Sequence, residues 1–357
     1  MFIPPHLMRQ RREFNERRTP LTEHYYRSQF RFNEATVDYL VDTFLGPGSG
    51  ETRGGALSNK KKMEITLRYV ADPGFMNSVA EVVGVSQPTV SITVSAVVNA
   101  ICAKAHEWII FPQNTQEVEV AAQNWSTRRG FPLCFGVVDG CLIKIQVPPY
   151  YNHPAEYFSG RKKFHCMNVQ IVCDAEYRIL NVNASWPGSV HDARVWRNSA
   201  VFRLLSSGMA GDKLLIADSA YPISPFLMKP FSQAEATIDP VKRRFNTKIC
   251  KDRVLVENTL GQLKSRFPML RTPIRLSLEK VPSFIVACCV LHNVGKHLGD
   301  TFKDDKMDEP DGDAVDGDDG SSDRHTGQPP SQGQGTSNAA AVRQAGQQKR
   351  NQIATII

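Results

Sequence analysis

The sequence has no apolar run that approaches the roughly 18 to 20 residues of a membrane-spanning helix, and its N-terminus lacks the apolar stretch of a signal peptide. Its eight cysteines include no pair at metal-finger spacing, and several stand inside apolar runs, where cysteine behaves as a small hydrophobic residue. These absences argue against a membrane partner, a zinc finger and secretion. We expect a soluble chain in a reducing, intracellular compartment.

The sequence does contain ample apolar material for a core and an uneven distribution of charge. Its 357 residues are 41% hydrophobic, which predicts two or three domains. The net charge is +7, but ten acidic residues fall between positions 304 and 323. Residues 1–302 hold 37 basic and 26 acidic side chains and therefore a net charge of +11. A body this basic predicts a polyanionic partner.

Both ends of the chain are predicted to lie outside the folded body. Residues 1–20 carry five arginines and little that is apolar, which fits a nuclear-import signal, a DNA-contacting arm or a solvated terminus without a role. The acidic and polar tail from position 300 onward is too hydrophilic to bury a core, and we predict that it is disordered. We predict a nuclear protein with a cytoplasmic pool.

The central feature is an apolar, β-branched run at residues 135–145 with a single carboxylate, Asp139, in its middle. This composition predicts a strand, and aspartate is among the residues least suited to one. A buried carboxylate is costly unless it is hydrogen-bonded, paired or bound to a metal, so Asp139 is a candidate functional residue. The alternative is that Asp139 and Gly140 open a hairpin. This run alone leaves both interpretations open.

A helix-turn-helix pattern precedes the Asp139 strand. Residues 78–83 are predicted as a short helix and residues 84–85 as a turn, and a longer helix begins at Ser86, with Pro88 in its first turn. In such motifs the second helix enters the major groove with its N-terminal side chains on base edges. The alternative is an ordinary helical hairpin. The candidate base-reading residues are Ser86, Gln87, Thr89 and Ser91.

Further elements are predicted on both sides of this motif. Upstream, apolar residues at helical spacing indicate a helix within residues 30–45, with Asn33 as a cap, and residues 46–58 resemble a linker. Downstream, the order is strand, hairpin, helix, strand and helix, which indicates an α/β fold. The hairpin covers residues 167–173 and 178–184, the first helix 193–205, the next strand 213–217, and the last helix 251–267.

Three carboxylates occupy related places in this order. Asp139 lies in the first strand, Asp218 ends the fourth, and Glu257 lies on the last helix. If the first and fourth strands are neighbours, the two aspartates meet at one edge of the sheet. A carboxylate cluster of this kind suits two divalent ions that act on a phosphodiester. Each residue also has a simpler interpretation, because Asp218 can cap a turn and Glu257 can pair with Arg253 in solvent.

Five motifs in this order resemble the PIF/Harbinger transposases and the nucleases derived from them in host genomes. The resemblance covers roughly residues 30–300. The motifs are GVVDG at 136–140, WPGSVHD at 186–192, ADSAYP at 217–222, ENTLGQLKSRF at 257–267 and ACCVLHN at 287–293.

The resemblance implies a DDE-type catalytic domain on an RNase H-like fold, with Asp139, Asp218 and Glu257 at the positions of the triad. It also implies that Asp192, at the start of its helix, matches an acidic position that serves as a fourth metal ligand in the family; a helix-capping role on Arg194 or Val195 is the alternative. The implied cofactor is Mg²⁺ or Mn²⁺. In the family a Myb-like partner protein assists DNA binding and nuclear entry.

We therefore expect a metal-dependent nuclease or transposase that acts on DNA, with a catalytically inactive DNA-binding adaptor as the alternative. A glycosidase would explain neither the basic body nor the helix-turn-helix. A homo-oligomer is left open. The basic loop of Arg161, Lys162 and Lys163 is the expected phosphate contact. The expected domains are a basic arm (1–29), a helical region (30–112) with the helix-turn-helix (78–101), an RNase H-like nuclease domain (130–299) and a disordered tail (300–357).

Overall fold

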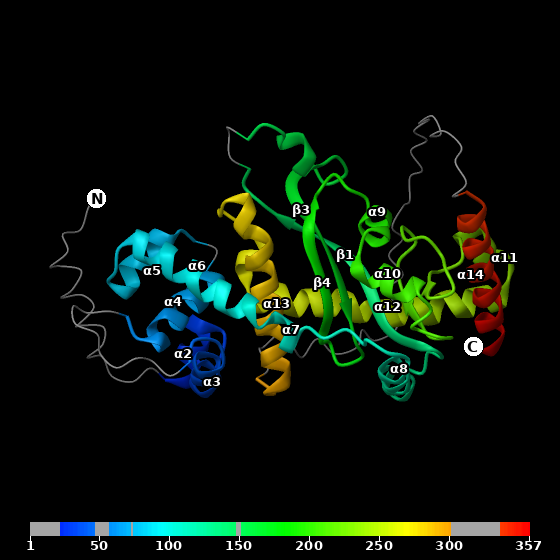
Figure 1. The fold of residues 1–357 in the computed structure, drawn as a ribbon, viewed down its shortest axis with the longest axis horizontal. Coiled ribbons are helices and arrows are strands. Elements are labelled where there is room, and N and C mark those ends of the chain that lie inside the picture. Colours follow the sequence, from blue (N-terminus) through cyan, green and yellow to red (C-terminus); the bar gives the residue numbers. More distant parts are fainter. Residues whose placement is uncertain (1–21, 47–56, 73, 148–150, 301–335) are drawn as a thin grey trace.

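The computed structural model describes residues 22–46, 57–72, 74–147, 151–300 and 336–357 (Figure 1). A group of helices forms one end of an elongated molecule, a twisted sheet occupies its centre, and the C-terminal helix lies at the other end. The long helices α12 and α13 lie against the sheet, and α13 also packs against the N-terminal helices. The sequence-based expectation of an α/β protein with a helical N-terminal region is confirmed.

The N-terminal region consists of helices, four of which are capped in the first turn by a side chain. Thr22, Asn33, Ser58 and Ser86 each accept a hydrogen bond from a backbone N–H in the first turn, as N-cap residues do. The predicted cap at Asn33 is confirmed. The helices are α2 (Glu23–Phe30), α3 (Glu34–Phe44), α4 (Asn59–Ala71), α5 (Met76–Val83), α6 (Gln87–Ala103) and α7 (Ala105–Trp108).

One boundary in this region differs from the prediction. The arm expected at residues 1–29 ends earlier, because α2 begins at Glu23 and buries Tyr26 in the core. Residues 1–21, and most of the linker expected at 46–58, lie outside the described residues. Helices α5 and α6 form where the helix-turn-helix was expected, and they meet at an angle of 103°. The turn between them uses Gly84 at φ +81°, a conformation that glycine adopts without strain.

The central sheet joins an antiparallel meander to two parallel strands. Strands β1 (Cys134–Lys144), β3 (Phe164–Cys173) and β4 (Ile179–Pro187) pair in antiparallel fashion, which confirms the predicted first strand and hairpin. Strand β5 (Leu214–Ile216) runs parallel to β1, and β6 (Leu227–Met228) runs parallel to β5. The short β2 (Phe158–Ser159) pairs with β3. Apart from β2, the strands therefore lie in the order β4-β3-β1-β5-β6.

The length difference between β1 and β5 opens a gap at the middle of the sheet. Strand β5 pairs with β1 only as far as Ile216, opposite Val137. Beyond Val137, one edge of β1 stays paired with β3. The opposite edge has no backbone partner among the described residues until the isolated parallel bridge that Ile145 forms with Ile274. Asp139 is the second residue past the end of this parallel pairing. The hairpin alternative at Asp139 and Gly140 is wrong, because β1 runs straight through both.

Helices cover both faces of the sheet. On one face, Cys141 and Ile171 belong to the hydrophobic cluster of α13. On the other, Val138 and Val172 pack with Trp196. The helices of this half are α8 (Thr115–Arg129), α9 (Asp192–Arg197), α10 (Ala200–Ser206), α11 (Gln233–Ile238), α12 (Pro240–Arg266), α13 (Val281–His297) and α14 (Thr336–Ile356), with 3-10 turns η1 (Pro154–Tyr157), η2 (Pro268–Arg271) and η3 (Leu278–Lys280).

Two helices differ from their predicted lengths. The helix expected at residues 193–205 is two helices, because the Ser199 hydroxyl accepts a hydrogen bond from the Phe202 N–H and starts α10 anew. The helix expected at 251–267 begins eleven residues earlier, at Pro240, where Asp239 caps it. Helical spacing alone located these segments but did not set their ends, which depend on capping side chains.

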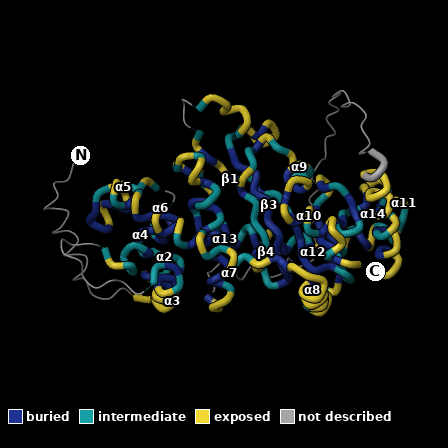
Figure 2. Tube along the Cα trace, viewed as in Figure 1, coloured by how far each residue is buried: buried dark blue, intermediate teal, exposed yellow. Residues whose placement is uncertain are grey.

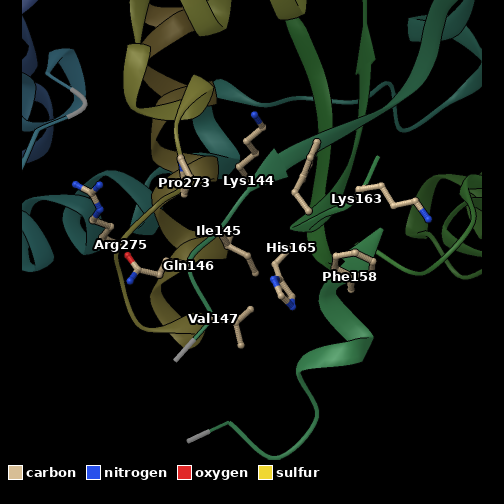
Figure 3. A pocket seen from close by; sticks show the side chains of 10 residues that line it. Lys144, Ile145, Gln146, Val147, Phe158, Lys163, His165, Pro273 and Arg275 are labelled. Carbon is tan, nitrogen blue, oxygen red and sulfur yellow. The ribbon is translucent and has the colours of Figure 1, made fainter. Parts of the chain in front are cut away.

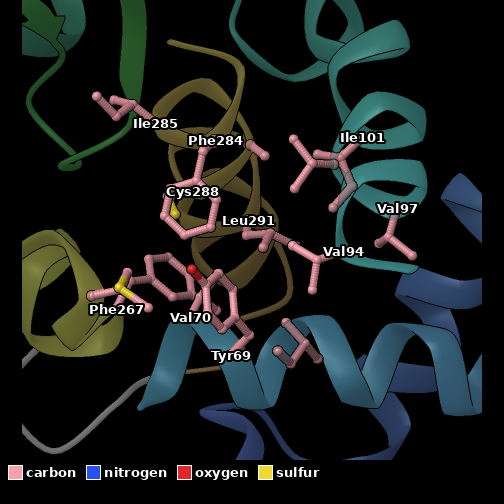
Figure 4. Packing of buried hydrophobic residues seen from close by; sticks show 14 of the residues in the cluster. Tyr69, Val70, Val94, Val97, Ile101, Phe267, Phe284, Ile285, Cys288 and Leu291 are labelled. Atoms are coloured by element: carbon pink, nitrogen blue, oxygen red, sulfur yellow. The ribbon is translucent and has the colours of Figure 1, made fainter. Parts of the chain in front are cut away.

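The helical region and the sheet share one hydrophobic core cluster. One cluster of buried residues runs from α2–α6 through α13 to β1 and β3 (Figure 2). Figure 4 shows its centre, where Tyr69 of α4 and Val94 of α6 face Phe284 of α13. The rings of Tyr69 and Phe284 meet edge to face at 6.0 Å. We infer that the position of α5 and α6 relative to the sheet is fixed by packing.

Helix α13 corrects one expectation about apolar runs. Within the described residues, the segment Leu278–His297 is long and apolar enough to cross a membrane by length and composition, and α5 with α6 passes the same test only as one bent segment. However, 67% of the Leu278–His297 segment is buried inside the protein. It serves here as the central core helix between the helical region and the sheet.

The C-terminal residues correct the prediction of a disordered tail. Residues 301–335 lie outside the described residues, but Thr336–Ile356 forms α14, which packs against α12 and the edge strand β6. The Arg350 guanidinium lies 3.8 Å from the centroid of the Phe231 ring, and Nζ of Lys349 donates to the Pro225 carbonyl at 2.7 Å. Ile353 and Ala354 are buried in the cluster beneath α12.

Because Ile353 is 2% exposed, we expect Ile353→Ala to lower the free energy of unfolding by about 2–4 kcal/mol, the usual cost of truncating a buried isoleucine. Val342→Ala on the same helix is the matched control, since Val342 is 38% exposed, and it should have little effect. Urea unfolding of the full chain measures both. Equal stability of the Ile353→Ala variant and the wild type would show that α14 does not dock in solution.

Candidate active site

Asp139 stands at the open edge of β1 and is half-buried. It pairs with Ile171 of β3, and its Oδ1 accepts a hydrogen bond from the Gly140 N–H at 2.8 Å. Successive side chains on a strand point to opposite faces, so Asp139 points toward the face that carries Cys141 and α12. Gly140 points toward the face that carries α9. The site is therefore reached from both faces of the sheet.

Asp218 follows the end of β5, where the neighbouring strand leaves the sheet. Its Oδ1 accepts a hydrogen bond from the Ala220 N–H at 2.9 Å, so the turn-capping role that the sequence suggested is present. The same turn places Tyr221 in the core, 1% exposed and edge to face with Trp196. Asp218 is thus held by a turn whose far end is anchored in the core, next to the open edge of β1.

Asp192 approaches β1 from the other face. It is the first residue of α9, and its Oδ1 accepts a hydrogen bond from the Asn168 side-chain amide at 2.7 Å. It stands directly over Gly140, where a Cβ atom would overlap its carboxylate. The N-cap residue of α9 is His191, and it makes no side-chain cap hydrogen bond. The capping alternative for Asp192 is therefore wrong, because its carboxylate is turned toward the sheet.

The three aspartates are near enough to influence one another's charge. The pKa of Asp139 is raised to about 6, chiefly by burial; the positive charge of Arg253 opposes the rise, and the negative charges of Asp218 and Asp192 contribute to it. Burial also raises the pKa of Tyr221, and the same three aspartates add to that rise. Carboxylates that disfavour each other's ionisation form a cluster of negative charge that a cation would stabilise.

Glu257 is placed differently from the three aspartates. It lies on α12 with its side chain 58% exposed, and its Oε1 is 3.9 Å from an Arg253 Nη2. This is the solvent-side ion pair that the sequence left as an alternative. Arg253 thus interacts with both Glu257 and the charge of Asp139. The structure brings Asp139, Asp192 and Asp218 together and leaves Glu257 at the rim.

Two cations of α12 belong to the site, although the sequence analysis did not select them as site residues. Arg253 acts on the charge of Asp139, and Lys264 hydrogen-bonds the Cys141 thiol, two residues along β1 from Asp139. Arg253, Glu257 and Lys264 recur at intervals of four and seven residues, so they share one face of α12. This spacing was visible in the sequence, but only the packing of α12 on β1 shows which face meets the sheet.

The donor chemistry fits a hard divalent cation. Asp139, Asp192 and Asp218 offer only carboxylate oxygens, the ligands that Mg²⁺ prefers, and their mutual repulsion is the kind that a bound cation relieves. In the part of the chain that the structure describes, no three His, Cys, Asp or Glu side chains are already arranged to hold a metal ion. Completing such a site therefore requires side-chain movement at its rim.

The other acidic residue of α12, Asp252, has a separate role in stability. Asp252 is 2% exposed, one of its oxygens lies 3.6 Å from Lys248 Nζ, and the other has no hydrogen-bond partner among the described residues. Burial raises the pKa of Asp252 to about 6, and Lys248 and Arg129 oppose that rise. Because the folded-state pKa exceeds the unfolded value of about 3.9, stability falls as the pH rises from about 4 to 6.

We therefore expect Asp252→Asn to raise the free energy of unfolding by about 2 kcal/mol near pH 7, where the cost of the buried charge is complete. Near pH 4 the two proteins should differ little, because the carboxyl is then protonated when folded. Urea unfolding at both pH values measures this, with the exposed Asp42→Asn as the control. A stabilisation that is the same at both pH values would contradict the burial argument.

The candidate DNA-reading residues of α6 are not equally available. The Ser86 hydroxyl caps the helix and lies 2.8 Å from the Thr89 hydroxyl, so both are engaged within the protein. Gln87 is exposed and Ser91 is half-buried. The loop residues Arg161, Lys162 and Lys163 are all exposed. Gln87 is thus the exposed candidate at the start of α6, and its side-chain amide donates to the Met76 sulfur at 3.9 Å.

Comparison with known proteins supports the family resemblance. The sequence model of the DDE superfamily endonuclease family matches residues 138–293, a segment that contains Asp139, Asp192, Asp218 and Glu257. No solved structure matches the chain.

Three relatives illustrate the similarity. The Homo sapiens protein named "Putative nuclease HARBI1" is 29% identical over 283 residues, which cover 78% of this chain and 79% of that protein. The Xenopus laevis protein of the same name is 28% identical over 278 residues, 77% of this chain and 78% of the relative. The Arabidopsis thaliana "Protein ALP1-like" is 26% identical over 301 residues, 79% and 73% of the two chains. The predicted similarity to Harbinger-derived nucleases is confirmed.

Proposed function

We propose that this chain, which carries a DDE superfamily endonuclease domain at residues 138–293, cleaves or transfers DNA phosphodiester bonds in a reaction that depends on Mg²⁺ or Mn²⁺. One observation carries the proposal. Asp139, Asp192 and Asp218 come from three separate elements and lie within electrostatic reach of one another, beside the gap where β5 ends along β1. Packing alone gives no reason to gather three carboxylates at a half-buried sheet edge, whereas a cation-dependent reaction does.

The strand order supports an RNase H-like fold for this domain. An antiparallel meander, β4-β3-β1, continues into two parallel strands, β5 and β6, and the carboxylates gather where the first of these ends. Open α/β sheets bind ligands at the carboxyl ends of strands, where neighbouring strands part. The position of the aspartates is the one that this rule predicts.

Each side chain of the site has a distinct role in the proposed reaction. Asp139, Asp192 and Asp218 would hold the divalent cations, and Glu257 would join them from the rim. Bound cations of this kind supply hydroxide from water and stabilise the leaving oxygen. Arg253 offsets the charge of the carboxylates, Asn168 fixes the orientation of Asp192, and the buried Tyr221 anchors the turn of Asp218.

Cleavage of end-labelled duplex DNA tests the proposal directly. We expect nicked or cut products with Mg²⁺ or Mn²⁺ and none with EDTA, because the carboxylates need a cation to act. DNA that is bound but never cut under any divalent metal would reject the nuclease and support a DNA-binding adaptor. If the protein neither binds nor cuts DNA, both the nuclease and the DNA-binding adaptor are rejected.

The DNA-binding part of the proposal rests on α5 and α6. Their angle of 103° is within the range of helix-turn-helix motifs, and the start of α6 carries the exposed Gln87. Helix α6 has no basic residue, so phosphate contacts would come from elsewhere, such as the loop at residues 161–163. We further propose that the protein acts in the nucleus, with a Myb-like partner.

Replacement of Gln87 separates base reading from phosphate binding. We expect Gln87→Ala to relax sequence preference, because base-edge contacts set specificity. Joint replacement of Arg161, Lys162 and Lys163 by alanine should weaken binding to all sequences and reduce its salt dependence. Selection from a random duplex library, with fluorescence anisotropy of the selected sites, measures both. An unchanged preference in Gln87→Ala would remove the support for α6 as the reading helix.

A further inference from the structure

A pocket of about 490 Å³ lies at the far end of β1, beyond the aspartates (Figure 3). Three stretches of chain line it: residues 144–147 at the end of β1, the β2–β3 region with Phe158 and residues 163–165, and the segment with Pro273 and Arg275. This volume falls within the range of about 300–1,000 Å³ that is typical of small-ligand sites. None of the roles proposed for the aspartate site involves this pocket.

The pocket is lined by positive charge without an acidic residue. Lys144, Lys163 and Arg275 are its cations, and all three side chains are exposed. Among the described residues, none of the three forms an ion pair with a carboxylate. Elsewhere on the surface, lysines and arginines such as Lys60 and Lys213 are each paired with two carboxylates. Unpaired cations around a concave surface favour an anionic ligand.

Aromatic rings lie among these cations. Lys144 Nζ is 4.8 Å from the centroid of the Phe164 ring. Phe158 is 37% exposed, and its ring is held edge to face against the His165 ring at 5.3 Å. An exposed ring that a neighbour keeps in place is a platform on which a nucleobase can stack, and cations beside it take the phosphates. This combination distinguishes a nucleotide from a simple anion.

Backbone hydrogen bonds fix the walls of the pocket relative to one another. The Ile145 N–H donates to the His165 carbonyl at 3.1 Å, and the Gln146 N–H donates to the Ile274 carbonyl at 3.0 Å. The Ile274 N–H in turn donates to the Lys144 carbonyl at 3.0 Å. The end of β1 is thus clamped between the two other walls. A ligand would meet a preformed site, which lowers the entropic cost of binding.

The position of the pocket connects the two DNA-contacting parts of the proposed function. Lys144 follows Asp139 by five residues on the same strand, a distance of about 17 Å at the usual rise of a strand. On the other side, the Arg275 guanidinium stacks at 4.2 Å over the ring of Phe75, the residue before α5. The pocket therefore lies between the aspartates and the helix-turn-helix.

We propose that this pocket binds an unpaired nucleotide of the DNA substrate a few nucleotides away from the cut, with its base against Phe158 and its phosphates on Lys144, Lys163 and Arg275. The proposal rests on the proposed function, because DNA is the polyanion that the aspartate site would cut. An unpaired nucleotide is required, since a base within a duplex cannot turn its face to Phe158 without unstacking. The site would thus favour ends or junctions that carry single-stranded DNA.

Binding without metal tests this inference independently of cleavage. The probes are a labelled blunt duplex, the same duplex with a short single-stranded extension, and deoxythymidine monophosphate as a competitor, all in EDTA. We expect wild-type protein to prefer the extended duplex by about 10-fold, and Phe158→Ala to abolish that preference while it leaves blunt-duplex affinity unchanged. Phe158→Trp should retain the preference, because a larger ring still stacks. Tyr25→Ala removes another exposed aromatic ring and is the matched control.

The outcomes separate the pocket from the active site. Equal affinity of wild-type protein for blunt and extended duplex would overturn the pocket proposal, even if the protein cuts DNA. A preference that survives in Phe158→Ala would also overturn it. A further outcome is that the mononucleotide displaces the extended duplex at concentrations far below those at which simple salt weakens DNA binding. That result would assign the pocket to free nucleotides instead of substrate DNA. Loss of the preference in Phe158→Ala, with cleavage absent, would support the pocket and reject only the nuclease.

Discussion

Asp139→Asn and Asp218→Asn should each reduce metal-dependent DNA cleavage by about 100-fold or more, the largest effects that we expect from any single change. Asparagine keeps the size of the side chain but removes the negative charge that offsets a divalent cation. Replacing even the outer partners of metal ligands costs about 10- to 100-fold in affinity or activity, so loss of a ligand itself should cost at least as much. DNA binding in EDTA should survive, because fewer carboxylates then oppose the phosphates.

Cleavage rates and DNA affinity of the same preparations, measured side by side, check this result. Asp42→Asn is the matched control, since Asp42 is exposed on α3, far along the chain from the site. Asp139→Asn or Asp218→Asn protein that cuts DNA as fast as the wild type would exclude the aspartates from the reaction. A parallel loss of DNA binding would point to misfolding, which thermal unfolding would detect.

Glu257→Gln is the informative companion to these variants. In the structure Glu257 is paired with Arg253 at the rim, and not with the aspartates. The Glu257 side chain of that pair is 58% exposed and the Arg253 side chain 21%, and the pair is 3.9 Å long. Loose pairs that are open to solvent contribute only about 0–1 kcal/mol, so a divalent cation can recruit Glu257 at little cost. We propose that Glu257 does join the site, and Glu257→Gln should then lose cleavage as Asp139→Asn does. Unchanged cleavage would leave Glu257 as a surface partner of Arg253.

The sequence identified some carboxylates of the candidate site more directly than others. Asp139 and Asp218 were identified because each interrupts or ends an apolar strand, a signal that is local. Their meeting followed from the assumption that the first and fourth strands are neighbours, and the parallel pairing of β1 with β5 bears this out. The prediction of Asp192 as a site residue depended on the family resemblance. No local pattern reveals its position over Gly140, because that position arises from the packing of α9 on β3.

The errors of prediction also have physical causes. The tail was assigned as disordered from its charge and polarity, which describe residues 304–323 well but not the end of the chain. Residues 339–349 are rich in Ala and Gln, which are good helix formers, and this signal could have predicted α14. Its docking on Phe231 could not be predicted, since a polar helix shows no strong apolar face. Likewise, no local pattern reveals that α13 joins the helical region and the sheet in one core.

Gly140→Ala should reduce cleavage by about 100-fold although it alters no charged group. A Cβ atom at position 140 would overlap the Asp192 carboxylate, which the Asn168 amide and the start of α9 hold in place. Either Asp192 rotates away or β1 shifts, and displacement of a catalytic group by about 1 Å can cost 10²-fold in rate. Gly261→Ala on α12 is the control, because nothing lies within 4 Å of a Cβ atom there, and alanine should stabilise the helix slightly.

A double-mutant cycle assigns the effect of Gly140→Ala to Asp192. If the added methyl group acts by displacing that carboxylate, then Asp192→Asn and Gly140→Ala should not add, because the second change removes a contribution that the first has already lost. Cleavage by the double variant should then equal that of the weaker single variant. Full additivity would show that Gly140→Ala distorts β1 and Asp139 instead. In either case the cycle measures how much of the reaction depends on the carboxylate that reaches β1 from the α9 face.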